Sequence, residues 1–206
     1  HRIARRQRQM CIRDRSNKRK IAVCFEGRDT AGKSSTINFF SEHLIPSNFK
    51  YVHLGIPTDE EKLNWFERWE KQLPKKGELV LFDRSWYTRA LIEPTLGYCT
   101  KTEYKKFMNK VNKWEKNLIN SDIELIKFYF SIDQDQQKRR LSARKNSKLK
   151  YWKLSKSDQM MVDKWDLFTL YKNQMFDVTS TKVAPWVVVN ANNKMIARLS
   201  LSLIHI

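Results

Sequence analysis

The segment 27–34 constrains this chain more than any other, because its sequence GRDTAGKS fits the phosphate-binding pattern G-x-x-x-x-G-K-[ST]. An apolar run precedes it at 21–26, and an amphipathic stretch follows at 36–40. A strand, a glycine-containing loop and a helix in this order surround a phosphate with backbone N–H groups and the positive helix end. We therefore predict phosphate or nucleotide binding by Gly27, Arg28, Ala31, Gly32, Ser34 and Ser35, with Lys33 reaching the outer phosphates.

A second feature of the same chemistry lies at 78–83, where the sequence ELVLFD reads as a buried strand ending in Asp83. An aspartate at the carboxyl end of a strand lies near the magnesium ion in phosphate-loop enzymes. A helix N-cap is the alternative role for such a residue. The phosphate-binding loop upstream favours a role for Asp83 in binding a metal ion or phosphate. The Ser34 hydroxyl is a further candidate Mg²⁺ ligand.

The charge of the chain favours a polyanionic partner. Its 206 residues contain 40 Lys and Arg against 22 Asp and Glu, a formal net charge of +18. Nucleic acid, polyphosphate and an acidic membrane surface are the candidates. Three cysteines without metal-ligand spacing favour a reducing cytoplasm, and no apolar run approaches the ~18 residues of a membrane span.

Short apolar runs alternate with amphipathic stretches, which favours an α/β fold with a parallel sheet and helices on both faces. We expect strands at 20–26, 49–54, 78–83, 123–132 and 186–189. The helix opened by a Thr58–Glu61 capping box is expected to bury Leu63, Phe66, Trp69 and Leu73. We expect a single domain over 19–199 and an extended or frayed segment at 1–20. Residues 1–18 and 200–206 are expected to be non-native or disordered tails, since 1–15 and 200–206 look like translated adapter sequence.

A strongly basic segment, 137–153, follows the fourth expected strand. Phosphoryl-transfer kinases place a mobile lid at this point, and a cationic lid neutralises phosphate charge and expels water. A solvated helix face is the alternative interpretation. We predict a basic helical lid, here called the lid segment, at about 138–157.

Four segments together closely resemble the polyphosphate kinase 2 family: FEGRDTAGK (25–33), LFDRSWYTRA (81–90), WKLS (152–155) with Asp158, and APW (184–186). The resemblance runs from about 19 to 199. It implies a P-loop kinase-type three-layer α/β/α fold with a helical lid. It also implies Mg²⁺-dependent, reversible phosphoryl transfer between inorganic polyphosphate and ADP, AMP or GDP, for example from polyphosphate and ADP to ATP.

The resemblance also implies roles for individual residues. Asp29 and Asp83 would hold Mg²⁺ and orient the accepting phosphate, and an acid inside a phosphate loop is costly unless a cation offsets it. The catalytic set would be Asp29, Lys33, Asp83, Arg84 and Arg140. Further phosphate contacts would come from Arg89, Arg144, Lys148 and Lys153. The family commonly forms dimers or tetramers, so we expect a homo-oligomer.

Two other functions remain open from the residues. A nucleoside monophosphate kinase of the thymidylate kinase type also has Phe-Glu-Gly before its loop and an Asp-Arg pair after its third strand. A basic nucleic-acid-binding P-loop protein is the second alternative. Most aromatic residues are assignable to the core, which argues against base stacking along a single-stranded nucleic acid.

Overall fold

The structure is a computed structural model that describes residues 2–149, 151–153 and 156–204. Within these residues, parallel strands form one sheet in the order β2-β3-β1-β4-β5. The strands are β1 (Lys20–Gly27), β2 (Phe49–Val52), β3 (Leu79–Asp83), β4 (Ile123–Ser131) and β5 (Trp186–Asn190). Because all strands are parallel, their carboxyl ends meet at one edge of the sheet, where the phosphate-loop sequence and Asp83 both lie.

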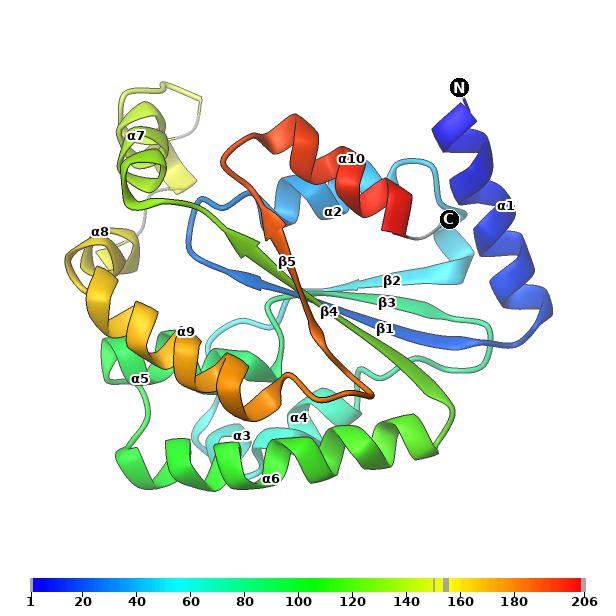
Figure 1. The fold of residues 1–206 in the computed structure, drawn as a ribbon, viewed down its shortest axis with the longest axis horizontal. Helices are drawn as coiled ribbons and strands as arrows, with labels where there is room; N and C mark the ends of the chain where they lie inside the picture. The colour runs from blue at the N-terminus through cyan, green and yellow to red at the C-terminus, as the bar shows by residue number, and fades with distance from the viewer. Residues whose placement is uncertain (1, 150, 154–155, 205–206) are drawn as a thin grey trace.

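Helices cover both faces of this sheet, which confirms the predicted three-layer α/β fold (Figure 1). One face carries α2 and α10, and the other carries α4, α6 and α9. The helices are α1 (Arg2–Ser16), α2 (Lys33–Ser41), α3 (Asp59–Leu63), α4 (Trp65–Glu70), α5 (Ile92–Leu96), α6 (Lys101–Asn120), α7 (Gln134–Lys145), α8 (Lys156–Asp163), α9 (Trp165–Thr179) and α10 (Lys194–Ile204). Short 3₁₀ turns are η1 (Pro46–Asn48), η2 (Trp86–Arg89) and η3 (Tyr151–Lys153).

Each strand contributes side chains to two separate hydrophobic cores. In β1, Ala22 and Cys24 pack on the α6 and α9 side, while Val23 and Phe25 pack on the α2 and α10 side. The alternation follows from the two-residue period of a strand, and burial on both faces explains the continuous apolar run in the sequence. None of the described helices has the length and apolar character needed to cross a membrane.

The N-terminal segment differs from the prediction. Residues 2–16 form α1 rather than an extended chain, so that prediction is wrong. Arginine and glutamine are good helix formers, and the end of α1 is held by tertiary contacts. The buried Asp14 accepts a hydrogen bond from Arg19, and Arg15 donates to the Asn48 side chain at 2.8 Å. At the other end, α10 continues past residue 199 and buries Leu201 completely.

The segment after Thr58 differs in a second way. The predicted capping box is present, with Thr58 N–H donating to Glu61 at 2.9 Å. The helix then breaks at Asn64, whose ψ is 53°, and this break changes which side chains of the next helix, α4, point toward the core. Leu63 is consequently 79% exposed, so its predicted burial is wrong, and Trp65 takes its place in the core.

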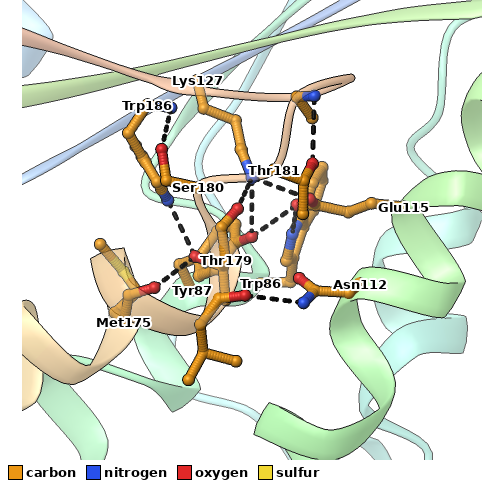
Figure 2. Close-up of polar contacts among 12 residues, drawn as sticks. Trp86, Tyr87, Asn112, Glu115, Lys127, Met175, Thr179, Ser180, Thr181 and Trp186 are labelled. Atoms are coloured by element: carbon orange, nitrogen blue, oxygen red, sulfur yellow. Dashed lines mark hydrogen bonds and ion pairs between the residues drawn. The ribbon is translucent and has the colours of Figure 1, made fainter.

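A buried ion pair joins four elements beneath the sheet (Figure 2). The ammonium of Lys127 in β4 donates to Glu115 of α6 at 2.8 Å and to the Tyr87 hydroxyl at 3.1 Å. It also donates to the Thr179 carbonyl of α9 at 2.8 Å. The second Glu115 oxygen accepts from Trp86 at 3.0 Å and from Tyr87 at 2.7 Å. The network therefore holds η2, which begins three residues after Asp83, against β4, α6 and α9.

We predict that Lys127→Met destabilises the protein by about 3–5 kcal/mol, because it leaves the Glu115 carboxylate buried without its cation. The double variant Lys127→Met/Glu115→Gln should recover most of this loss, since the charge is gone while both acceptor bonds of Glu115 can remain. Urea unfolding followed by tryptophan fluorescence measures both. A loss below about 1 kcal/mol for Lys127→Met would show that the pair is not a determinant of stability.

Candidate functional site

The phosphate loop connects β1 to α2 and depends on two glycines. Gly27 has φ of 137°, and a Cβ atom there would lie 2.4 Å from the Phe130 carbonyl oxygen of β4. Gly32 precedes α2 with φ of 99°. Side-chain-bearing residues rarely adopt these angles, and at Gly27 they would also collide with the neighbouring strand. The glycines of the sequence pattern are therefore required by backbone geometry.

The loop opens into a cavity of about 780 Å³ at the carboxyl edge of the sheet. The loop, the ends of β2 and β3, the lid segment and α10 all contribute to its wall. Six of the lining residues are Lys or Arg, and three are aspartates, so the cavity suits a polyanion. The lining residues are Asp29, Thr30, Gly32, Lys33, Ser34, Ser35, His53, Asp83, Arg84, Arg140, Ala143, Arg144, Trp152, Asp158, Lys194 and Arg198.

Two of the three aspartates that line this cavity, Asp29 and Asp83, are candidate site residues from the sequence. Asp83 is buried and accepts hydrogen bonds from the Ser34 hydroxyl and, at 2.7 Å, from the Tyr51 hydroxyl. Asp29 accepts from the Arg84 guanidinium. Arg84 has φ of 66°, a conformation that costs energy for a residue with a side chain and persists only where the surroundings enforce it.

A magnesium site fits these residues. Within the described part of the chain, no group of three or more His, Cys, Asp or Glu side chains is arranged to hold a metal ion. Magnesium, however, retains several waters and is commonly held by one or two carboxylates together with substrate phosphates. Asp29, Asp83 and the Ser34 hydroxyl, which line one cavity, form a donor set of this kind.

Lys33 is buried within the loop. Its ammonium donates to the Gly27 carbonyl at 2.8 Å and to the Arg28 carbonyl at 3.0 Å. Burial lowers the pKa of Lys33, and the neighbouring Arg84 lowers it further. The lysine is therefore pre-positioned by backbone carbonyls at the base of the cavity.

Glu26 is a buried residue beside the site that the sequence reasoning missed. One of its oxygens accepts from the Ser85 N–H at 2.7 Å and from the Ser85 hydroxyl at 2.8 Å. The bonds join the end of β1 to the segment that follows Asp83 and Arg84. Burial raises the pKa of Glu26 to about 7. A lone acid at the end of an apolar strand, directly before the glycine loop, was the available signal.

Glu26 should make stability depend on pH. Its pKa rises from the ordinary 4.5 to about 7 in the folded protein. Between these values the unfolded chain has lost the proton and the folded chain retains it, so stability falls as pH rises. Glu26→Gln removes this loss, and we expect its unfolding free energy relative to wild type to increase by ~3 kcal/mol from pH 4 to pH 8. Denaturant unfolding across this range tests it, and a pH-independent difference would contradict it.

Arg140 of α7 joins three parts of the site. Its Nη1 group donates to the carbonyls of Thr30 at 3.0 Å and Ala31 at 3.3 Å, both in the phosphate loop. Its Nη2 group donates to the carbonyls of Ala191 at 2.7 Å and Asn192 at 2.9 Å, between β5 and α10. Arg140 lines the cavity, but its guanidinium is engaged by backbone oxygens.

The structure brings most of the predicted residues to this cavity. Asp29, Lys33, Asp83, Arg84, Arg140, Arg144, Ser34, Ser35 and Gly32 all line it. Arg144 of α7 pairs with Asp158 of α8 at 3.4 Å, which joins these two helices across the lid segment. Lys148 is exposed and does not line the cavity. The side chain of Lys153 lies outside the described part of the structure.

The structure does not bring the side chains of Arg28 and Arg89 to the cavity. The Arg28 guanidinium stacks 3.3 Å from the centre of the Trp165 ring and donates to Thr169, both in α9. Burial lowers the pKa of Arg28 to about 10. Arg89 is 2% exposed and pairs with Glu93 at 2.7 Å and Glu103 at 3.0 Å. Both arginines therefore hold structural elements together, and only the backbone of Arg28 belongs to the loop.

Seven cavity residues were not anticipated as site residues: Thr30, His53, Ala143, Trp152, Asp158, Lys194 and Arg198. His53 follows β2, and its Nδ1 atom lies 3.0 Å from the Asp83 carbonyl oxygen. Lys194 and Arg198 lie four residues apart on α10, which follows the last strand. The available signal was that β5 also ends at the edge of the sheet that carries the phosphate loop.

A parallel five-stranded sheet with a phosphate loop, an aspartate at the end of β3 and a cationic cavity defines a P-loop kinase-like α/β protein. The sequence model of the polyphosphate kinase 2 family (PPK2) matches residues 1–206. The chain therefore belongs to this family, as its motifs predicted.

Curated relatives agree with this assignment. The chain is 45% identical over 182 residues to an NDP-polyphosphate phosphotransferase 2 of Ruegeria pomeroyi, covering 88% of this chain and 53% of that protein. It is 44% identical over 179 residues to a GDP-polyphosphate phosphotransferase of Mycolicibacterium smegmatis, covering 86% of this chain and 63% of that one. The chain thus spans little more than half to about three-fifths of the length of these relatives.

Solved structures agree as well. A polyphosphate kinase 2 from Arthrobacter aurescens superposes with a TM-score of 0.92 at 30% identity, over 98% of this chain and 74% of that one. A polyphosphate kinase 2 described as putative, from Pseudomonas aeruginosa, superposes with a TM-score of 0.91 at 31% identity, over 98% of this chain and 44% of that one.

Proposed function

We propose that this chain transfers a phosphoryl group between inorganic polyphosphate and a nucleoside di- or monophosphate, reversibly and with Mg²⁺. The observation that carries the proposal is the cavity in which a phosphate loop, three aspartates and six Lys or Arg side chains meet. Polyphosphate and a nucleotide are both polyanions, so joining them requires such a concentration of positive charge. The printed names of the relatives, NDP- and GDP-polyphosphate phosphotransferase, support the same chemistry.

Catalysis of this transfer is positioning and neutralisation of charge on phosphate oxygens. Lys33, at the base of the loop, and Arg84, at the end of β3, would contact the oxygens of the transferred group. Arg84 is directed by its bond to Asp29. The lid segment would then cover the cavity from the α7 side, with Arg144 facing the phosphates, and exclude water that would otherwise compete as acceptor.

Asp29, Asp83 and the Ser34 hydroxyl would hold the magnesium ion. When bound, Mg²⁺ neutralises charge on the phosphate oxygens of donor and acceptor. The Tyr51 hydroxyl, which donates to Asp83 at 2.7 Å, orients that carboxylate. ADP, AMP and GDP are the candidate acceptors, and a nucleotide panel distinguishes them.

The proposal predicts that purified protein with Mg²⁺, ADP or GDP and long-chain polyphosphate forms the nucleoside triphosphate. Lys33→Ala and Asp83→Asn should each reduce the rate by about 10³-fold or more, because the first removes a cation at the reacting phosphates and the second removes a ligand of the Mg²⁺ ion that neutralises them. Lys110→Ala, an exposed change on α6, is the matched control and should keep full activity. Thermal unfolding confirms that each variant is folded.

Other outcomes of this experiment would identify the alternatives. Reaction of ATP with dTMP, and none with polyphosphate, would assign the chain to the thymidylate kinase type. Nucleic-acid binding as the main activity, unchanged in Lys33→Ala, would assign it to a basic binding protein.

The magnesium site makes a separate prediction. Asp29→Asn keeps the shape of the side chain and removes one negative ligand, so the Mg²⁺ concentration for half-maximal rate should rise about tenfold or more. Chelation of the metal in the wild-type protein should stop turnover. Steady-state rates across a magnesium titration measure both. Near-normal Mg²⁺ dependence in Asp29→Asn would remove Asp29 from the metal site.

A further inference from the structure

We propose that Lys194 and Arg198 of α10 bind the phosphate oxygens of the polyphosphate chain and extend the site beyond the phosphate loop. The inference rests on the proposed function and deepens it, because it assigns one wall of the cavity to the linear polyanion. Neither residue is part of the phosphate-loop, Asp83 or lid motifs.

The position of α10 is the first argument. β5 runs parallel to β4, so its carboxyl end and the start of α10 lie at the edge of the sheet that holds the phosphate loop (Figure 1). Lys194 and Arg198 are four residues apart, which places them on the same helix face, and both line the cavity. The Lys194 side chain lies 3.9 Å from the position that a Cβ of Gly32 would take, so it borders the loop directly.

The attachment of α10 is the second argument. Arg140 donates to the carbonyls of Ala191 and Asn192 with one nitrogen and to loop carbonyls with the other. The Asn192 side chain also accepts from the Asp133 N–H at 3.0 Å. These bonds fix the start of α10 against the loop and α7. Arg140 therefore acts as a clamp, and Lys194 and Arg198 present their charge on a positioned helix.

Charge is the third argument. Segment 194–204 contains no acidic residue, and its first turn adds the positive end of a helix dipole to the two side-chain charges. The Arg198 guanidinium lies over the Phe39 ring of α2, 5.4 Å from its centre. This contact limits the conformations of Arg198 near the cavity, so less entropy is lost when it binds an anion.

The chemistry of this wall selects the polyphosphate chain over the nucleoside. The residues that line the cavity next to α10 are Gly32, Ser35, Lys194 and Arg198, none of which offers the flat apolar surface that a base uses for stacking. The rings that line the cavity come from other elements, His53 after β2 and Trp152 in η3. A linear chain of phosphates needs only a row of cations. Its length should therefore determine whether it reaches α10.

The test compares two double variants of equal charge change. Lys194→Gln/Arg198→Gln should raise KM for long-chain polyphosphate about tenfold or more, because two charge-assisted contacts are lost. KM for the nucleotide and kcat should change less than twofold, and KM for tripolyphosphate should change less than KM for the long chain. Lys110→Gln/Lys116→Gln, on exposed positions of α6 across the sheet, should leave all of these unchanged.

Direct titration with long-chain polyphosphate, without nucleotide, separates this inference from the proposed function. Absence of turnover in wild type would overturn the proposed function, while weaker binding by the α10 variant would still support the inference. Equal polyphosphate affinity in the two double variants would overturn the inference about α10. A rise in KM for the nucleotide alone would also overturn this inference. Lys194→Gln alone changes an exposed position and should weaken polyphosphate binding about threefold or more. This single variant provides the test if the double variant misfolds.

Discussion

Six like charges line one cavity, and their mutual repulsion is the constraint on which the arrangement of this site depends. Backbone carbonyl oxygens reduce this repulsion, because they accept hydrogen bonds from the ammonium of Lys33 and the guanidinium of Arg140. Carboxylates offset the charge of two more in the pairs Arg84–Asp29 and Arg144–Asp158. Because carbonyls are neutral overall, the cavity keeps the net positive charge that a polyanionic substrate requires.

Buried polar contacts connect the cavity residues to the surrounding strands and helices. Glu26 links the end of β1 to Ser85, and the Lys127–Glu115 pair holds the following η2 turn through Tyr87. Arg28 connects the loop to α9 by stacking on an aromatic ring. The loop is thus attached to the lid segment itself through Arg140 of α7, and to α9, which follows the lid segment, through Arg28. Movement of the lid segment would be expected to act on the loop directly.

Much of the fold followed from local patterns. The apolar runs predicted all five strands, and the glycine pattern predicted a loop whose φ angles only glycine adopts readily. Asp83 was predicted from its place at the end of a strand. Leu63 was not predicted correctly, because the break at Asn64 rotates the following helix and helical spacing assumes an unbroken one. The N-terminal helix was missed because it lacks apolar periodicity and depends on contacts such as Arg15 with Asn48.

The sequence by itself determined the phosphate loop, the strands that the loop and Asp83 follow, and the excess of positive charge. These features depend only on residue types and on their spacing over a few positions of the chain, so they can be predicted without knowledge of the tertiary structure. The tertiary structure decided which cations face the cavity. Arg28 and Arg89 are turned to Trp165 and to Glu93, while Lys194 and Arg198, far along the chain, reach the loop. A side chain's direction is set by the partners that surround it, and those partners come together only when the sheet has formed.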